Sequence, residues 1–219
     1  MTQVIGGFAA LELHPNILAA VIATGYEEPS AIQAMSIPVI LAGDDMIGQA
    51  QTGTGKTAAF ALPILSRIDP AKREPQALIL APTRELALQV ASAFETYAKQ
   101  MPGVNVIAVY GGAPMGPQLK AIRNGAQIIV ATPGRLVDHM RRDEKVLSTV
   151  RHLVLDEADE MLKLGFMDDL EVIFKGIPAE RQTVLFSATL PHSIRAIAEK
   201  HLRNPKHVKV ETKTQTVTA

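Results

Sequence analysis

Short, nearly uninterrupted apolar runs alternate with longer amphipathic stretches from residue 44 onward. The runs predict β-strands at 45–48, 77–81, 104–110, 128–131, 152–155, 183–187 and 207–210. The stretches between them predict helices at 56–67, 85–100, 117–123, 134–142, 167–175 and 191–201, the first of which Pro63 should kink. Strands that are apolar on both faces are typical of parallel sheets covered on both sides, so we expect an α/β fold with a mostly parallel, twisted sheet. Ligands of such folds bind at the carboxyl ends of the strands.

The first 43 residues predict helices and turns rather than strands. Pro15 leads into a helix at 17–22 that Gly25 ends, and Ser30 is the expected N-cap of a second helix, which reaches residue 40 and is bent or ended by Pro38. We expect residues 1–43 to belong to the same domain as 44–210. The polar residues 211–219 are expected to form a tail or the start of a linker.

The composition narrows the class of protein. A chain of 219 residues suffices for one α/β domain with a substantial core. Cysteine is absent, which excludes disulfides and thiolate metal sites and fits a reducing cytosol. Neither a signal peptide nor an apolar run of membrane-spanning length is present, so we expect a cytoplasmic protein with no membrane partner.

The charge balance limits how nucleic acid can be bound. Lys and Arg number 22, as do Asp and Glu, which argues against coating nucleic acid by bulk charge but leaves room for a local basic groove. Aromatic residues make up 4% and Trp is absent, which argues against an extended base-stacking platform. Any nucleic acid is therefore expected to be held by its backbone.

A glycine-rich loop between a predicted strand and a predicted helix is the strongest local signal. It reads Ala50-Gln51-Thr52-Gly53-Thr54-Gly55-Lys56-Thr57. The glycines let backbone N–H groups surround a phosphate, and the following helix adds its positive N-terminal end. Lys56 is placed to neutralise β- and γ-phosphates, and the Thr57 hydroxyl to bind Mg²⁺. The alternative is an ordinary glycine turn that caps a helix.

A second signal is the acidic sequence that follows the predicted strand at 152–155. Asp156 can hold Mg²⁺ through its water shell, and Glu157 can orient or deprotonate an attacking water. The alternative is a helix N-terminus rich in acids, which the helix dipole favours. A phosphate loop in the same domain favours the metal site.

Upstream of the phosphate loop, Gln33 and Tyr26 are candidates for contact with a base. The amide of Gln33 can pair with N6 and N7 of adenine, whereas guanine presents two acceptors there, and Tyr26 can stack on the ring. Taken alone, a glutamine in a helix is more often solvated, and a tyrosine more often packs against its neighbours, than either contacts a base.

Together these segments resemble the DEAD-box family of ATP-dependent RNA helicases, specifically its N-terminal RecA-like domain, and in particular the bacterial cold-shock and ribosome-assembly members. The motifs occur in the family's order and span nearly the whole chain. They are the Q motif at 25–33 with Phe8 as its upstream aromatic, the phosphate loop at 50–57, Pro82-Thr83-Arg84-Glu85-Leu86-Ala87 (motif Ia), Gly111-Gly112, Thr132-Pro133-Gly134-Arg135 (motif Ib), Asp156-Glu157-Ala158-Asp159, and Ser187-Ala188-Thr189 (motif III).

The resemblance implies a role for each motif, with ATP and Mg²⁺ as cofactors. Implied to bind the nucleotide are Phe8, Tyr26, Gln33, Gln51, Thr52, Gly53, Thr54, Gly55, Lys56 and Thr57. Lys56, Asp156 and Glu157 are implied to be catalytic, with Thr57 and Asp156 holding Mg²⁺ largely through water. Implied to grip the RNA backbone, with little sequence specificity, are Pro82, Thr83, Arg84, Gly111, Gly112, Thr132, Pro133, Gly134 and Arg135.

Asp159, Ser187 and Thr189 are implied to couple nucleotide state to RNA, Ser187 and Thr189 through hydrogen bonds to the acids at 156–159. Glu85 is expected to brace its loop. Without the resemblance, Arg84 and Arg135 are equally well explained as solvated charges at helix ends. The alternative for Ser187 and Thr189 is a polar turn.

The chain departs from the family in one respect. Family members carry a second RecA-like domain, which supplies arginine fingers and half of the RNA site, and nothing after residue 210 resembles it. We therefore expect the nucleotide-binding half of an RNA helicase, nearly inactive alone. A stand-alone ATP- and RNA-binding module without turnover is the main alternative. Another P-loop ATPase or kinase is a weaker one, because a small substrate does not explain motifs Ia and Ib.

Overall fold

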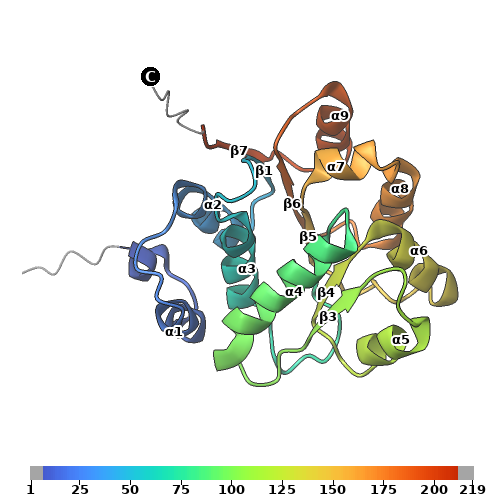
Figure 1. Ribbon diagram of the computed structural model, residues 1–219, viewed down its shortest axis with the longest axis horizontal. Coiled ribbons are helices and arrows are strands. Elements are labelled where there is room, and N and C mark those ends of the chain that lie inside the picture. Colours follow the sequence, from blue (N-terminus) through green and yellow to red (C-terminus); the bar gives the residue numbers. More distant parts are fainter. Residues whose placement is uncertain (1–6, 212–219) are drawn as a thin grey trace, which may run out of the picture.

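The computed structural model describes residues 7–211. Over this range seven strands form one sheet in the order β3-β4-β2-β5-β6-β1-β7, and every neighbouring pair is parallel (Figure 1). The strands are β1 (Met46–Gln49), β2 (Ala77–Leu80), β3 (Val106–Val109), β4 (Ile128–Ala131), β5 (His152–Leu155), β6 (Gln182–Ser187) and β7 (Lys206–Lys209). The predicted α/β fold with a parallel sheet is confirmed.

Helices connect the strands and cover both faces of the sheet. They are η1 (Gly7–Leu11), α1 (Pro15–Ala23), α2 (Ala31–Leu41), α3 (Lys56–Arg67), α4 (Arg84–Tyr97), η2 (Ala98–Gln100), α5 (Met115–Arg123), α6 (Pro133–Arg142), α7 (Ala158–Lys163), α8 (Met167–Gly176) and α9 (His192–His201). Figure 1 shows α1 to α4 on one side of the sheet and α5, α6, α8 and α9 on the other.

The two faces follow from the alternation of side chains along each strand. On β2, Ala77 and Ile79 pack toward α3 and α4, whereas Leu78 and Leu80 pack toward α6 and α8. All four are completely buried, which explains why this strand is an unbroken apolar run.

Aromatic packing fixes the position of α3 on its face of the sheet. The ring centroid of Phe60 lies 6.1 Å from that of Phe94 on α4 and 5.7 Å from that of Phe186 on β6. Such pairs contribute about 0.5–1.5 kcal/mol beyond the apolar area that they bury. Gly48 on β1 leaves room for Phe186, because a Cβ at residue 48 would lie 2.5 Å from that ring. The packing holds α3, and thus the loop before it, against the sheet.

The structure corrects several predicted elements. Strand β3 is shorter than 104–110, because the Asn105 N–H is bonded to the side chain of Gln127. Helix α2 continues past Pro38 to Leu41, and α3 passes Pro63 without interruption, so that the kink at Pro63 stays a prediction. The short helices η1 and α7 were not predicted. Of the expected linker, residues 212–219 lie outside the described residues, as do residues 1–6 of the N-terminal segment.

Candidate functional site at the carboxyl edge of the sheet

The motif loops gather at the carboxyl edge of the sheet and divide it into two halves. Neighbouring strands end level with one another, Gln49 beside Ser187 and Leu80 beside both Leu155 and Ala131. The loops after β5, β6 and β1 form the phosphate-loop half, and those after β3, β4 and β2 form the Arg84–Arg135 half. The two halves meet where β2 adjoins β5. Strand order alone therefore separates the motifs expected to handle nucleotide from those expected to handle RNA.

In the phosphate-loop half, the glycine-rich loop has the conformation that its sequence predicts. Gly53 and Gly55 have φ angles of +85° and +87°, a region that disfavours residues with a Cβ. Gly55 is the N-cap of α3, and its carbonyl accepts the first helical hydrogen bond from the Ala59 N–H. Gln51, Thr52 and Gly53 are exposed. The loop and the start of α3 therefore form an open surface of backbone at the positive end of a helix, which suits an anion.

Lys56, the first residue of α3, lies beneath this loop and faces Asp156. Its Nζ is 3.5 Å from Oδ1 of Asp156, and the side chains are only 7% and 2% exposed. Oδ1 accepts no hydrogen bond from any residue in the range 7–211, so the contact is ionic. Burial raises the pKa of Asp156, an effect that the positive charge of Lys56 opposes and that the negative charge of Glu157 adds to. A buried carboxylate with an unsatisfied oxygen suits a metal ion or its water shell.

Glu157, next along the chain, is held in an uncommon backbone conformation. Its φ and ψ are +51° and +53°, and it is the N-cap of α7. A left-handed conformation at a residue other than glycine costs about 1–3 kcal/mol and is typical of functional sites. The acidic sequence thus begins a helix, which was the alternative to a metal site. It also follows directly on a buried strand, as the metal site requires.

The segment before α2 is attached to the phosphate loop through two side chains. Ser30 Oγ donates to the carbonyl of Thr54 at 2.9 Å, and Gln33 Nε2 donates to that of Gly55 at 3.2 Å. Oε1 of Gln33 accepts from the Ser30 N–H at 2.9 Å, which completes a capping box. A Cβ at Gly55 would lie 2.5 Å from Gln33 Nε2. The close approach, together with the φ of +87°, favours glycine at 55, and the amide expected to read adenine borders the phosphate loop.

The two aromatic candidates lie in the same region but differ in exposure. Tyr26 is 51% exposed, whereas Phe8 on η1 is 3% exposed and packs into the core. Both line a hollow of about 320 Å³ between η1 and α1. The structure leaves Tyr26 free to stack on a base and limits Phe8 to supporting this hollow from within.

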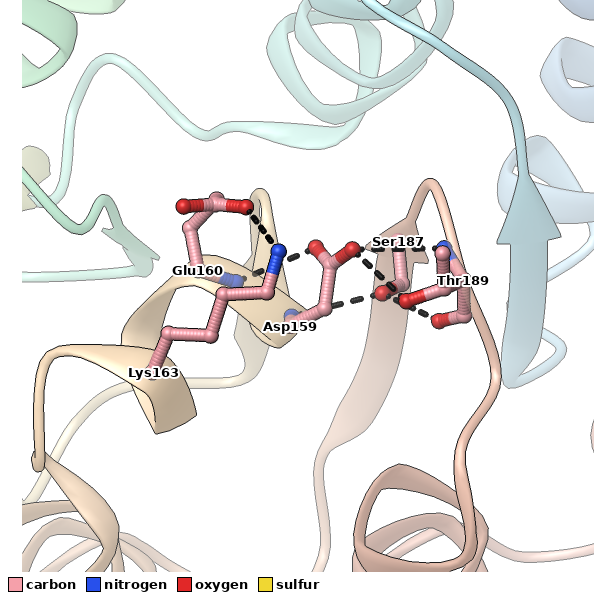
Figure 2. Close-up of polar contacts among 5 residues, drawn as sticks. All are labelled: Asp159, Glu160, Lys163, Ser187 and Thr189. Carbon is pink, nitrogen blue, oxygen red and sulfur yellow. Dashed lines mark hydrogen bonds and ion pairs between the residues drawn. The ribbon is translucent and has the colours of Figure 1, made fainter.

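Asp159 on α7 is bound to the loop that follows β6 (Figure 2). Its Oδ2 accepts hydrogen bonds from the Thr189 hydroxyl at 2.9 Å and from the Thr189 N–H at 3.3 Å. Ser187 Oγ accepts from the Asp159 N–H at 3.3 Å and donates to the Thr189 carbonyl at 2.7 Å. The expected contact of Ser187 and Thr189 with the acids is thus present. It joins the loops after β5 and β6.

These hydrogen bonds affect the pKa of Asp159. Burial raises the pKa of its carboxyl, but the bonds from Thr189 and its neighbours outweigh burial and hold the pKa below the ordinary value. The carboxyl of Asp159 therefore stays ionised to lower pH than an ordinary aspartate does. Beyond it, Glu160 forms a separate exposed pair with Lys163, whose Nζ lies 2.7 Å from Oε1 (Figure 2).

The chemistry of this half fits a nucleoside triphosphate with Mg²⁺. Gly53 is exposed, and apart from its chain neighbours no residue of the range 7–211 comes within 4 Å of a Cβ position built on it, which leaves the loop open to a phosphate group. Lys56 supplies a cation, Thr57 at the second position of α3 supplies a hydroxyl, and Asp156 supplies a buried oxygen with no hydrogen-bond donor in the range 7–211.

The Arg84–Arg135 half presents backbone and arginine at the starts of helices. Thr83 caps α4, its Oγ1 accepting from the Leu86 N–H at 3.2 Å. The guanidinium of Arg84 lies 4.9 Å from the ring centroid of Tyr110. Gly111 and Gly112 are exposed, and Gly112 has a φ of +85°. The loops after β2 and β3 are thus in contact through Arg84 and Tyr110.

Arg135 on α6 differs from the freely solvated charge considered at sequence level. Its side chain is 15% exposed, and Nη1 donates to the carbonyl of Ala113 at 2.7 Å. Thr132 is the N-cap of α6, and Gly134 lies in its first turn. Pro82 and Pro133 are buried, so they contribute to this half through the shape of their loops rather than through exposed rings.

Sequence reasoning missed three residues of this half. Tyr110 lies beneath Arg84, and Gln118 and His139 are buried polar residues that contact one another on α5 and α6. Tyr110 directly precedes the glycine pair, which is a local signal. Gln118 and His139 carry none, because their meeting depends on how α5 packs beside α6.

A seven-stranded parallel sheet with a glycine-rich loop after β1 and an acidic strand end after β5 defines a P-loop α/β domain of the RecA-like type. The chain matches the DEAD/DEAH box helicase family over residues 30–197. It belongs to that family, as the motifs predicted.

Relatives and solved structures agree with this assignment. The chain is 53% identical to the ATP-dependent RNA helicase DeaD of Mycobacterium tuberculosis over 94% of this chain and 37% of that protein. It is also 53% identical to the protein of the same name from Escherichia coli, over 95% of this chain and 33% of that protein. The crystal structure of a DEAD box protein from the hyperthermophile Methanococcus jannaschii superposes with a TM-score of 0.89, at 40% identity, over 94% of this chain and 56% of that one. The chain thus spans about a third of the length of the curated relatives that it matches.

Between residues 7 and 211, none of the helices combines the length and the apolar character that crossing a membrane requires.

Proposed function

We propose that this chain is the nucleotide-binding part of an ATP-dependent RNA helicase. It binds ATP with Mg²⁺ in the phosphate-loop half and the backbone of single-stranded RNA in the Arg84–Arg135 half. The division of the sheet edge into two contiguous halves is the observation that carries the proposal, since it provides separate places for nucleotide and RNA that share the β2–β5 boundary. The names of the relatives support the same function.

The residues of the phosphate-loop half divide the work of holding the nucleotide. Gln33 pairs with the adenine edge and Tyr26 stacks on its ring, while Gln51, Thr52, Gly53, Thr54 and Gly55 surround the phosphates with N–H groups. When the nucleotide binds, the ammonium of Lys56 leaves its contact with Asp156 and pairs with the β- and γ-phosphates. Thr57 and Asp156 hold Mg²⁺ largely through water. Glu157 accepts a proton from the attacking water or orients it. When bound, MgATP supplies the anhydride bond whose hydrolysis resets the RNA clamp.

On the other half, Thr83, Arg84, Gly112, Thr132, Gly134 and Arg135 grip successive phosphates and 2′-hydroxyls with little dependence on sequence. Asp159, Ser187 and Thr189 lie between the loops after β5 and β6 and report the nucleotide state to this half. Their hydrogen bonds support the first step of such a relay, within the phosphate-loop half, because a shift of α7 would pull directly on the loop after β6.

In the whole protein, a second RecA-like domain closes over ATP and RNA, completes the RNA groove and separates duplexes locally. An arginine finger from such a domain is worth about 10³–10⁵ in rate, so residues 1–219 alone hydrolyse ATP very slowly and without stimulation by RNA. A cytoplasmic location belongs to the same proposal and rests on the sequence features given above, whereas a role in cold shock or ribosome assembly rests on the resemblance alone.

The alternative, an ATP- and RNA-binding module without turnover, makes a different prediction for an extended chain. Fusing a second RecA-like domain from a DeaD relative through its own linker should raise RNA-stimulated ATP hydrolysis by orders of magnitude if this chain is a helicase part. The linker matters because it keeps the effective concentration of the second domain in the millimolar range. A folded fusion with no turnover would favour the module.

Calorimetric titration with ADP and GDP tests the nucleotide assignment. ADP should bind about 1–3 kcal/mol more tightly than GDP, the worth of a bidentate base contact, and Gln33→Ala should remove most of that difference. Ser30→Ala is the matched control, because it breaks the other contact to the phosphate loop, at Thr54, and leaves the adenine edge alone. Ser30→Ala should weaken the binding of ADP and the binding of GDP equally. Equal affinities for ADP and GDP in the unmodified chain would refute the assignment.

A further inference from the structure

A buried amide on α5 connects the glycine-pair loop to α6. Gln118 is 6% exposed, and its Nε2 donates to the carbonyl of Tyr110 at 3.0 Å. Its Oε1 accepts from His139 Nε2 at 3.1 Å and lies 3.4 Å from Arg135 Nη1. One side chain thus contacts the end of β3 and two residues of α6.

The same cluster holds both ends of the loop that contains Gly111 and Gly112. Gln118 binds the carbonyl of Tyr110, directly before the pair, and Arg135 binds that of Ala113, directly after it. A glycine pair loses more conformational freedom on ordering than any other pair of residues. Contacts at both ends therefore restrict a loop that is otherwise free to adopt many conformations.

The Tyr110 carbonyl, which can only accept a hydrogen bond, determines which way the amide of Gln118 points. With Nε2 of Gln118 directed at the Tyr110 carbonyl, Oε1 faces the imidazole, so that His139 carries its proton on Nε2 and donates it. Nδ1 of His139 is then a buried acceptor with no partner among the described residues, and the side chain is completely buried.

Burial and the charges around His139 keep its imidazole neutral. Burial lowers its pKa, as do the positive charges of Arg135 and Arg142, against an opposing effect of Asp138. The imidazole therefore stays neutral at physiological pH, with a single N–H to donate.

We propose that Gln118 is a positioning residue for RNA binding. With its amide bonded to both the Tyr110 carbonyl and His139, it holds the Gly111-Gly112 loop and the Arg135 guanidinium in the arrangement that RNA phosphates meet. The inference rests on the proposed RNA-binding function of this half. RNA then binds a loop that is already ordered. If a single residue of the loop had to be ordered when RNA binds, the affinity for RNA would be about five- to thirty-fold weaker.

The test compares Gln118→Leu with Gln127→Leu. Gln127 is also a completely buried glutamine bonded to backbone, with Oε1 accepting from the Asn105 N–H and Nε2 donating to the Gly103 carbonyl, but it lies at the opposite edge of the sheet. Binding of a single-stranded ten-nucleotide oligouridine is measured by fluorescence anisotropy at several salt concentrations, and ADP binding by calorimetry. Gln118→Leu should weaken RNA binding about ten-fold and change ADP binding less than two-fold. Gln127→Leu should leave both unchanged.

The salt dependence separates positioning from direct contact. Loss of a phosphate contact lowers the slope of log affinity against log salt by about 0.7 for single strands, whereas Gln118→Leu should leave the slope nearly unchanged. His139→Phe is a second variant, which removes both the Nε2 donor and the unpartnered Nδ1. It should keep or raise stability and still weaken RNA binding several-fold, an outcome that a purely structural role for the cluster does not produce.

NMR order parameters of the Gly111 and Gly112 amides, measured without RNA, keep this inference separate from the proposed function. They should fall in Gln118→Leu and not in Gln127→Leu. Unchanged order parameters, or equal RNA affinity in Gln118→Leu and the unmodified chain, would overturn the positioning role. If the unmodified chain bound no RNA, the proposed function would fall, and the role in RNA binding with it.

Discussion

The Lys56–Asp156 ion pair lies at the centre of the phosphate-loop half, and its contribution to stability can be measured. At a separation of 3.5 Å and an effective dielectric constant of about 20, the attraction amounts to about 5 kcal/mol. Desolvation of two buried side chains offsets part of it, and Oδ1 gains no hydrogen bond from residues 7–211. We therefore expect a net coupling of about 2–4 kcal/mol.

The perturbations are Lys56→Met, Asp156→Asn and the double substitution. Lys56→Met leaves a buried carboxylate without its counter-charge and should cost about 3–5 kcal/mol of the free energy of unfolding. Asp156→Asn should cost less, about 1–3 kcal/mol, because the long stem of Lys56 lets its ammonium reach water. The double variant has neither charge and should be more stable than the sum of the single effects predicts.

Urea unfolding of the four proteins at pH 7, followed by circular dichroism, completes the double-mutant cycle. The pH dependence adds a second readout. Without Lys56 the pKa of Asp156, which burial already raises, should rise further. A raised pKa in the folded state contributes stability at low pH that is lost as the pH rises through it, so Lys56→Met should recover relative to wild type on acidification. Additive effects, with a coupling below about 0.5 kcal/mol, would refute the reasoning.

Two further predictions concern buried polar groups on either side of this pair. Burial, with the charge of Arg67 nearby, lowers the pKa of His152 from 6.5 to about 4. As the pH falls from 7 to 4, the free energy of unfolding of wild type, measured in urea, should therefore fall by up to about 3 kcal/mol relative to that of His152→Asn. A pH-independent difference would contradict this. Thr189→Val removes the 2.9 Å bond to Asp159 and should raise the pKa of that carboxyl in an NMR titration, whereas an unchanged pKa would show that the hydroxyl does not stabilise the carboxylate.

The sequence predicts the sheet well because its strands are buried on both faces. Strands β2 and β4 are continuous apolar runs, β5 is apolar after His152, and none of the three has an exposed position, so their patterns are unambiguous. Helix α7 was not predicted, because its six residues are too few to show the periodic pattern of apolar positions that marks an amphipathic helix. At Pro38, burial of Ile37 and Ile40 against the core outweighs the lost hydrogen bond, and the helix continues.

The site was predictable where a motif is local and unpredictable where it depends on packing. The phosphate loop and the acids after β5 are contiguous in sequence, and each has a fixed relation to the preceding strand. The pairing of Lys56 with Asp156 and the cluster around Gln118 require the order of strands and the placement of helices, which the pattern along the chain leaves open. Arg135 illustrates the difference. From the residues alone it was as compatible with a solvated charge as with an RNA contact, and the structure shows it 15% exposed and bonded to backbone.

The division of the carboxyl edge into a nucleotide half and an RNA half is the central claim, and one NMR experiment tests it most directly. Uniformly labelled protein comprising residues 1–219 is titrated with MgADP and, separately, with a single-stranded RNA oligonucleotide at low salt. We predict that MgADP shifts the amide signals of the loops after β1 and β5, that RNA shifts those after β2, β3 and β4, and that both ligands bind together. RNA that shifts the phosphate loop and is displaced by MgADP would contradict the account.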